Sequence, residues 1–347
     1  MINEHSDNLN KAWKGTCRVL FGKEIGELRE YEEWLTEYLP LMGKQKSCIS
    51  GKEVALESNN YCSAANFISA DEIKEETIEP LSINEIKDID SIIEAISEKW
   101  KYAGNKCLGN SECVESSDLI MDSQYVTNSS NIVESRYVVS SCLYRQGSRY
   151  IFGSTFGGAS EFLIRGNLVY ESKRVFESQL IMQSGDAYLS HDCIGCDNIM
   201  FCFFQRNKRN CIGNLELPNN KYAELKNKLL KEIVEELEKL KKFSTLFSMV
   251  PDKKPPKELA LEIPKQKEEE NMEIIEKSFL STFKTVLKKE PVGLDKYEKW
   301  LSKHTIRLEE VESPFGNKTC LPKDMIDAIF LQVPRNRVVS FIEGIEL

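Results

Sequence analysis

A six-residue repeat occupies the middle of the chain, where sixteen units follow one another from Ser111 to Gln205. A small residue opens each unit, and the phase slips by one residue between Ser141 and Ser148. The openers are Ser111, Ser117, Ser123, Ser129, Ser135, Ser141, Ser148, Ser154, Ser160, Gly166, Ser172, Ser178, Ser184, Ser190, Cys196 and Cys202.

A second column lies three residues after each opener and is apolar in fourteen of the sixteen units. Only Gly157 and Gln205 interrupt it. A disordered serine-rich linker would have no reason to hold apolar residues in one phase, so the repeat predicts a folded element. The apolar members are Val114, Ile120, Val126, Ile132, Val138, Tyr144, Ile151, Leu163, Val169, Val175, Ile181, Ala187, Cys193 and Ile199.

A period of six matches neither the 3.6 residues of an α-helix nor the two of a flat strand. It matches a coiled β-ribbon, in which each unit supplies one short strand and one corner, and successive coils stack about 4.8 Å apart. Proline, which would remove backbone donors, is absent from Ser111 to Leu217. With three units per coil, we expect about five coils and roughly 25 Å of solenoid.

The composition of the 347-residue chain narrows its class. A net charge of −9 gives no reason to expect binding to nucleic acid or to an anionic membrane surface. No apolar run approaches the roughly eighteen residues of a membrane-spanning helix, and Met1 to Asn10 lacks the apolar core of a signal peptide. Eleven cysteines, an odd number, argue against a complete disulfide framework. We therefore expect a cytoplasmic protein in a reducing environment.

Helical and linker patterns divide the rest of the chain. Apolar residues recur at helical spacing from Ile83 to Trp100 and from Tyr222 to Phe247, and residues 251–271 combine four prolines with many Lys and Glu. We expect a helical and β module over 1–75, a connecting helix over 83–101, the solenoid over 105–217, a capping helix over 218–248, a linker over 249–271 and a C-terminal module over 272–347.

The two ends of the chain are copies of one another at a constant offset of 266 residues. Two interpretations remain open. Both copies are caps, which solenoids need for solubility, or each copy is a docking module and the solenoid spaces the two so that a repeated partner binds with avidity. The matches are Thr16 with Thr282, Lys23-Glu24 with Lys289-Glu290, Leu28 with Leu294, Tyr31-Glu32 with Tyr297-Glu298, Trp34-Leu35 with Trp300-Leu301, Ser47 with Ser313, and Lys52 with Lys318.

Cys193, Cys196, Cys202 and Cys211 have the spacing C-x2-C-x5-C-x8-C, which ligands of zinc or of an iron–sulfur cluster can have. All four, however, fall on positions that the repeat fills with core residues, and a buried free cysteine behaves as a small apolar side chain. Core packing is therefore the interpretation that we adopt. A metal or iron–sulfur scaffold is the alternative.

Three other features have a functional and a structural interpretation. His191 is one of three histidines, and hexapeptide-solenoid acyltransferases use a histidine as general base, so an acyltransferase is a further alternative. The glycines between 153 and 158 lack the context of a phosphate loop and indicate a tight corner or the close approach of another chain. A solvated helix face explains a local basic patch, which comprises Arg206, Lys208, Arg209, Lys221, Lys226 and Lys228.

Three stretches resemble the end of a group of cysteine-rich hexapeptide-repeat proteins of prokaryotes, in which Ser/Cys-x-x-Cys units run on to an Arg-Asn-Lys stop and a tyrosine-containing helix. These are Ser190-His-Asp-Cys-Ile-Gly-Cys, Arg206-Asn-Lys-Arg-Asn-Cys and Tyr222-Ala-Glu-Leu. The group carries a zinc-ribbon-like segment before the repeats, and the segment from Cys48 to Cys62 is similar to a degenerate version that has lost ligands. The resemblance covers roughly Ser111 to Phe247 and implies a fold but no activity.

The sequence thus predicts an α+β protein, with a central single-stranded β-solenoid (β-helix) of hexapeptide repeats flanked by duplicated, mainly helical modules. We expect a non-enzymatic scaffold or adaptor without a cofactor, which binds a protein partner, including a repeated or oligomeric one. The candidate partner anchors, if they are not module core, are Trp13, Tyr31, Trp34, Phe279, Tyr297 and Trp300.

Overall fold

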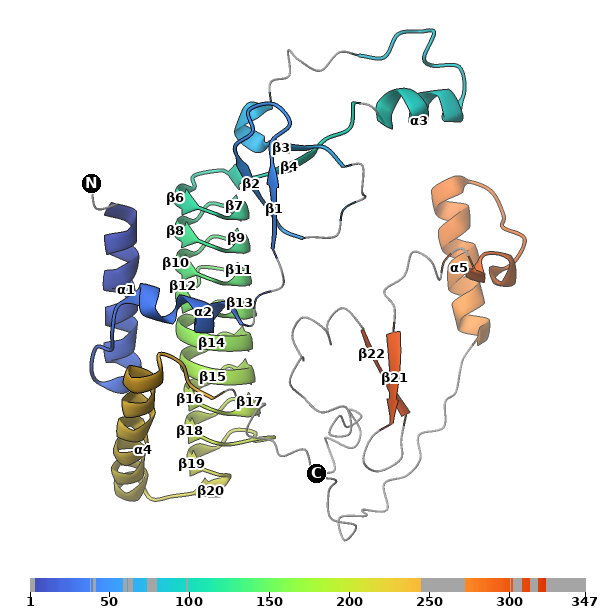
Figure 1. Cartoon of the computed structure of the whole chain (residues 1–347). Coiled ribbons are helices and arrows are strands. Elements are labelled where there is room, and N and C mark those ends of the chain that lie inside the picture. The colour runs from blue at the N-terminus through green and yellow to red at the C-terminus, as the bar shows by residue number, and fades with distance from the viewer. Residues whose placement is uncertain are drawn as a thin grey trace. The chain divides into compact units, whose positions relative to one another are not determined.

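The computed structural model describes residues 4–37, 39, 42–58, 61, 65–73, 80–97, 99–244, 272–299, 301, 308–312 and 318–322. The chain divides into two compact units, Met1–Met249 and Val250–Leu347. A β-solenoid of about nine turns dominates the first unit (Figure 1). The linker expected over 249–271 lies outside the described residues.

The first unit begins with helical elements that lie beside the solenoid (Figure 1). Helix α1 spans Glu4–Phe21, the 3-10 turn η1 spans Leu28–Tyr31 and the short helix α2 spans Glu32–Thr36. The spacing of the apolar residues in α1 places them on one face, which is buried.

A small β-structure follows these helices. Strand β1 (Gly43–Lys46) pairs antiparallel with β2 (Glu53–Leu56). Strand β3 (Phe67–Ser69) pairs parallel with β4 (Tyr102–Gly104) and leads into the 3-10 turn η2 (Ala70–Glu72).

Helix α3 spans Ile89–Ser97 and is shorter than the helix expected over 83–101. The Asp88 carboxylate accepts a hydrogen bond from the backbone N–H of Ser91 at 2.8 Å. This contact caps the first turn, so the helix begins after Asp88 and leaves the isoleucines before it in turns.

Each coil of the solenoid contains two hexapeptide units, and our expectation of three is wrong. Parallel strands pair at an offset of twelve residues, as Val126 does with Val138. The offset is thirteen where the extra residue enters, as between Arg136 and Arg149. The solenoid is therefore a flattened, two-sided coil of about nine turns, roughly 40 Å long at ~4.8 Å per turn.

The two sides of this coil are called face A and face B. Face A contains the strands that follow Ser111, Ser123 and every second opener thereafter, and face B contains those that follow Ser117, Ser129 and every second opener thereafter. The strands of the whole solenoid, faces A and B together, are β5 (Cys107–Leu108), β6 (Glu112–Glu115), β7 (Asp118–Met121), β8 (Gln124–Thr127), β9 (Ser130–Val133), β10 (Arg136–Val139), β11 (Cys142–Arg145), β12 (Arg149–Phe152), β13 (Thr155–Gly158), β14 (Glu161–Tyr170), β15 (Lys173–Met182), β16 (Gly185–Tyr188), β17 (His191–Ile194), β18 (Asp197–Met200), β19 (Arg209–Ile212) and β20 (Leu215–Glu216).

The apolar column points into the coil, as predicted. Val126, Ile132 and Val138 are fully buried in one cluster with the rest of the column. Tyr144 and Gly157 are neighbours in register on face B, and a Cβ atom at Gly157 would lie 2.5 Å from the Tyr144 ring. The glycine that interrupts the apolar column therefore makes room for the tyrosine of the preceding coil.

The small-residue column is a ladder of hydrogen bonds. A typical opener, Ser172, donates its hydroxyl to the Tyr170 carbonyl at 2.7 Å and accepts the N–H of Ser184, one coil later, at 3.1 Å. Cys196 and Cys202 donate their thiols to carbonyls of their own corners in the same way. The column therefore selects a short side chain that both donates and accepts, because each corner buries backbone groups that need partners.

Left-handed backbone makes the corners. The residues two and five places after the opener of nearly every unit have positive φ, as Tyr125 (56°) and Asn128 (48°) do; they are called the second and fifth positions, since positions are counted from the opener. The extra residue of the slip enters an exposed turn at Gly147, where φ is 73°. A glycine adopts this conformation without strain, so the insertion leaves the ladder intact.

Helices cover the outward side chains of face A. The rings of Trp13 and Phe152 lie 5.3 Å apart, and those of Phe21 and Phe176 lie 5.0 Å apart. Helix α4 (Asn219–Leu240) buries its apolar side in the same cluster, so the expected capping helix packs along the solenoid. At Gly153, a corner residue with φ 61°, a Cβ atom would lie 2.8 Å from the Leu35 side chain of α2, so the close approach comes from the same chain and not from another one.

A buried ion pair fixes α2 to the coil. Arg165 and Glu177 occupy the fifth position of consecutive face A units, are fully buried, and form a hydrogen bond of 2.6 Å between Nε and Oε2. The Arg165 guanidinium also donates to the Trp34 carbonyl and lies 5.0 Å from the centroid of that indole. Its Nη1 atom is 3.0 Å from a carboxylate oxygen of Glu37.

Both ends of the solenoid are covered by the first unit itself. At the first coil, the Asp118 carboxylate accepts the N–H of Glu57, and Asn105 accepts the N–H of Ala55 through its side chain. At the last coil, β20 turns back and pairs antiparallel with β19. Such endings protect the open backbone groups of a terminal strand from pairing with other chains.

The described part of the second unit contains helix α5 (Met272–Leu287), the 3-10 turn η6 (Leu294–Lys296) and an antiparallel hairpin of β21 (Leu308–Glu312) and β22 (Lys318–Pro322). Helix, 3-10 turn and hairpin follow in the same order as α1, η1 and β1–β2, with positions shifted by about 266 residues. Both helices end in a left-handed residue at this offset, Gly22 (φ 78°) and Lys288 (φ 56°).

Candidate functional site

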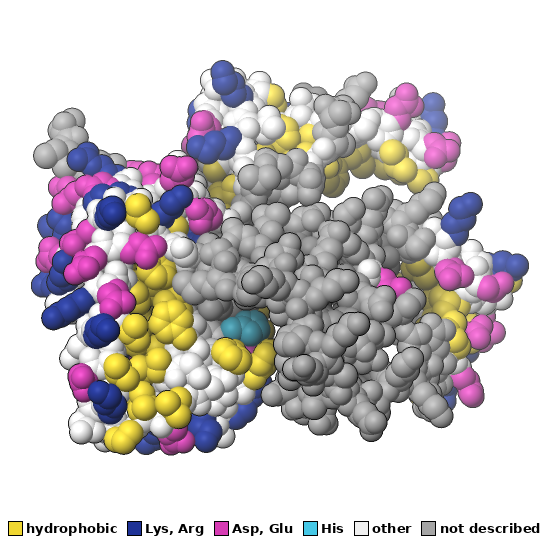
Figure 2. Space-filling view, turned by 60° about the horizontal axis from the view of Figure 1, so that its bottom comes forward, with side chains coloured by type: hydrophobic (Ala, Val, Ile, Leu, Met, Phe, Trp, Pro, Cys, Tyr) yellow, Lys and Arg dark blue, Asp and Glu magenta, His cyan; other side chains and the backbone are white. Residues whose placement is uncertain are grey.

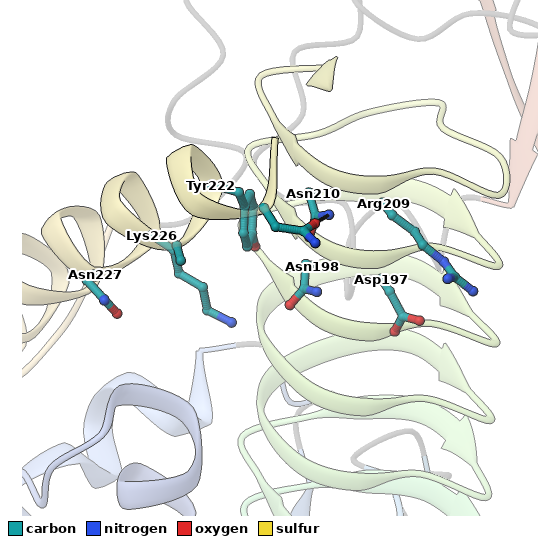
Figure 3. A pocket seen from close by; sticks show the side chains of 9 residues that line it. Asp197, Asn198, Arg209, Asn210, Tyr222, Lys226 and Asn227 are labelled. Carbon is teal, nitrogen blue, oxygen red and sulfur yellow. Dashed lines mark hydrogen bonds between the residues drawn. The ribbon is translucent and has the colours of Figure 1, made fainter. Parts of the chain in front are cut away.

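A shallow polar cleft of about 630 Å³ lies between α4 and the last two coils of face A (Figure 3). Burial raises the pKa of the Tyr222 phenol, and the Lys226 ammonium lies 3.1 Å from an Asp186 carboxylate oxygen. The described lining contains no histidine, cysteine, serine or threonine, so it suits polar binding better than nucleophilic catalysis. It consists of Asp197, Asn198, Arg209, Asn210, Asn219, Tyr222, Ala223, Lys226 and Asn227.

The basic patch beside this cleft is largely neutralised. Five of its six cations lie within 4.0 Å of a carboxylate oxygen, as the solvated-face interpretation predicts. The pairs are Arg206 with Asp192, Lys208 with Glu216, Lys221 with Glu224, Lys226 with Asp186 and Lys228 with Glu232.

His191 lies at the start of β17 on face B, and it is not among the residues that line the cleft. It is half-buried between Gln179 and Phe203, its neighbours in register, and its ring meets that of Phe204 edge-on at 5.6 Å. Burial lowers the pKa of His191, and the adjacent Asp192 opposes this only in part. A general base needs access to an acceptor, so this position gives the acyltransferase alternative no support.

The four cysteines of the possible metal site all lie in the solenoid core, where their columns place them. Burial raises the pKa of Cys193 to about 12 and also raises the pKa values of Cys202 and Cys211. Metal ligation needs thiolates, which this environment disfavours. Within the described residues, no group of three or more His, Cys, Asp or Glu side chains is arranged to hold a metal ion. Of the zinc-ribbon-like segment, Cys48 is exposed and Cys62 lies outside the described residues.

Three of the candidate partner anchors are core residues, which is the structural use that the sequence left open for them. Trp13, Tyr31 and Trp34 are at most 3% exposed and pack between α1, α2 and face A. The Tyr31 hydroxyl donates to the Leu237 carbonyl, and the Trp34 indole N–H donates to the Phe243 carbonyl. The N-terminal copy is therefore a structural cover of the solenoid.

The C-terminal segment that matches these helices in sequence has a similar ring contact, and among the described residues its helix has exposed apolar side chains. The ring centroids of Phe279 and Tyr297 lie 5.5 Å apart, and those of their counterparts Trp13 and Tyr31 lie 5.2 Å apart. Phe279 and Tyr297 are half-exposed, and Trp300 lies outside the described residues.

The residues of α5 that match the solenoid-facing side of α1 are solvent-accessible. Val286 is 69% exposed, whereas its counterpart Leu20 is 2% exposed. This surface, which we call the α5 face, comprises Ile275, Phe279, Phe283, Val286 and Leu287, and its counterparts in α1 are Leu9, Trp13, Cys17, Leu20 and Phe21. Apolar side chains gather along one side of this helix (Figure 2).

Face B of the solenoid has an apolar strip of its own. Its second-position residues in four consecutive coils are Leu143, Phe156, Leu168 and Leu180, all half-buried. Three fourth-position residues widen this face B strip on the later coils, namely Tyr170, Met182 and Ile194. None of these seven side chains belongs to one of the hydrophobic clusters formed by the described residues.

Helix α3 is a further exposed apolar surface. Ile89, Ile93 and Trp100 are each more than half exposed, and apolar side chains follow one side of the helix (Figure 2). The sequence indicates its amphipathic pattern but not its exposure.

A twelve-residue signal in the sequence could have revealed face A. Tyr125, Tyr137 and Tyr150 recur at twelve residues plus the slip, and with Phe162 they stack at 4.9–5.0 Å, one ring per coil. Apolar fourth-position residues alternate in the same way on the covered side. The hexapeptide columns are identical on both faces and therefore hide this doubled period.

The fold and the described surfaces define a β-solenoid protein with one covered and one open face. No family model, curated protein or solved structure matches the chain. None of the described helices is both long and apolar enough to cross a membrane.

Proposed function

We propose that this protein is a non-enzymatic scaffold or adaptor, in which a β-solenoid carries a docking module at its C-terminal side. The proposal rests on one contrast. The same module face is buried on the solenoid in the N-terminal copy and exposed, still apolar, in the C-terminal copy. An exposed apolar face of this kind is typical of a protein-binding surface.

Of the two interpretations that the sequence leaves open, the cap is supported for the N-terminal copy and the docking module is proposed for the C-terminal copy. The N-terminal copy instead stabilises the solenoid that bears it. The nine cysteines within the described residues are free thiols, which supports our placement of the protein in a reducing, cytoplasmic compartment. The resemblance to cysteine-rich hexapeptide-repeat proteins of prokaryotes adds no activity to this proposal.

Photo-crosslinking on the full chain tests the docking role. We would place a photoreactive phenylalanine analogue at Val286, on the α5 face, and separately at Thr285, whose N-terminal counterpart Val19 is 41% exposed. Scaffold function predicts crosslinks to a discrete protein from Val286 and few from Thr285. Equal yields from both positions, or none from either, would contradict it.

A further inference from the structure

We propose that the α5 face docks on the face B strip of a second copy of this chain, so that copies associate head to tail. This inference rests on the proposed function and names its partner. The internal duplication identifies the kind of surface that the module recognises, because its first copy already packs on a β-solenoid of this sequence.

The contacts of the first copy define that recognition. From α1, Trp13 and Phe21 place rings edge-on against Phe152 and Phe176, which are fourth-position residues of face A. Leu20 offers its backbone carbonyl to the hydroxyl of Tyr188 on the same column at 2.8 Å. One face of the module's helix thus covers a column of outward-pointing apolar side chains, with one side chain from each successive coil of the solenoid.

The second copy has the same face without a described surface to cover. Its five positions remain apolar, as Ile275, Phe279, Phe283, Val286 and Leu287. Its tyrosine still packs on the helix, so the face is presented by the same local fold. A cap that no longer needed a solenoid would have no reason to keep five apolar residues at these positions, three of them exposed and two half-buried.

Face A cannot be the target, because α1, α2 and α4 already cover it. Face B offers the matching surface, with one apolar side chain per coil over the four coils from Leu143 to Leu180. From Leu143 to Ile194, which continues the strip on the next coil, the strip rises by four coil spacings, about 19 Å at ~4.8 Å per coil, and this is the length of about twelve helical residues at ~1.5 Å each. The α5 face from Ile275 to Leu287 has that length.

Charges of both signs border the two surfaces, including Arg145 on face B and Glu276 on α5, and some of them are complementary. On face B, Glu134 and Glu171 are exposed fifth-position residues beside the strip. On α5, Lys277 and Lys288 are exposed, and the last-turn Lys284 is exposed but paired with Glu290 at 2.9 Å. The attraction between exposed charges is modest and would guide orientation more than it adds affinity.

A head-to-tail contact joins two different surfaces, so complementation between variants tests it. Val286→Lys damages the α5 face, and Leu168→Lys damages the face B strip. Each variant alone should lose self-association in sedimentation velocity, with the dissociation constant raised about tenfold or more. An equimolar mixture should regain a heterodimer, because the first variant keeps its face B strip and the second keeps its α5 face.

Matched controls add the same charge outside the surfaces. Thr285→Lys lies on the same helix, and Asn131→Lys occupies the same column of face B on a coil that is already polar. Both should associate as the wild-type chain does. All four substituted side chains are partly or fully exposed, so circular dichroism should show an unchanged fold.

Three results would overturn the inference: a wild-type chain that stays monomeric at every concentration, a Leu168→Lys variant that associates normally, or a variant mixture that fails to complement. Crosslinks from Val286 to a different protein, together with a monomeric chain, would overturn the self-association and leave the scaffold function standing. To distinguish these cases, one of two mixed pools of the chain with the photoreactive analogue at Val286 is labelled with ¹⁵N, because crosslinks between copies then join a labelled chain to an unlabelled one.

Discussion

Replacing Ser172 by alanine would remove one rung of the serine ladder. The hydroxyl accepts the buried N–H of Ser184 and donates to the Tyr170 carbonyl. That carbonyl also accepts the N–H of Gln183, so it keeps a partner in the variant. The N–H of Ser184 does not have this second bond, and a buried donor without a partner costs about 1–3 kcal/mol. We expect the free energy of unfolding to fall by this amount.

Urea or thermal unfolding followed by circular dichroism measures the change. For a unit of this size, about 1 kcal/mol shifts the melting temperature by roughly 2–4 °C. Ser172→Cys should cost less than Ser172→Ala, because Cys196 accepts the N–H of Lys208 through its sulfur at 3.4 Å. The exposed Ser116 supplies a control alanine variant in the same solenoid. A Ser172→Ala variant within about 0.5 kcal/mol of wild type, or a cysteine variant as damaging as alanine, would refute the ladder as a source of stability.

Three further perturbations follow from the core. Gly157→Ala should lower the free energy of unfolding by about 1–3 kcal/mol in chemical unfolding, because its Cβ would lie 2.3 Å from a carbonyl oxygen. Adding Tyr144→Leu to this variant should restore only the part of the loss that is due to the ring, and strictly additive effects of the two changes would contradict this coupling. Arg165→Met should lower the free energy of unfolding by about 3–5 kcal/mol, because the buried Glu177 carboxylate loses its guanidinium partner, whereas replacing both residues by apolar ones should lower it much less. Equal losses of unfolding free energy in the two variants would argue against a buried pair. Burial raises the pKa of Cys193 from 9.0 to about 12, so the folded state keeps a proton that the unfolded chain loses, and the free energy of unfolding should fall as pH rises from 9 to 12. Cys193→Val should reduce the slope of this decline by up to about 1.4 kcal/mol per pH unit, and an unchanged slope would exclude the effect.

Much of the fold could be predicted from the repeat. The inward column, the small-residue column and the position of the slip all follow from which residues recur every sixth place, and the structure confirms each of them. Gly157 is an informative exception. It interrupts the pattern in the sequence, and its reason is a single large neighbour, Tyr144, which only the register of the coils brings beside it.

The candidate site was less accessible to sequence reasoning. The aromatic anchors of the two copies match at a constant offset, and nothing in that match tells which copy is buried. The polar cleft combines residues of α4 with those of two different coils, so its lining is scattered over thirty-one positions of the chain, from Asp197 to Asn227. Neither the cleft nor the face B strip exists until the coils are stacked.

The sequence by itself determined that this chain forms short strands and corners in a repeating ribbon, because an apolar column in phase with a small one has no other stable use. It also predicted a duplication of the end module, from residues that match at a constant offset. Only the tertiary structure decided that two units close a coil, since the angle of each corner depends on backbone conformation and not on the period. Only the tertiary structure distinguished the two copies, because α1 and α5 have the same apolar pattern, and burial depends on the surface that packs against each helix.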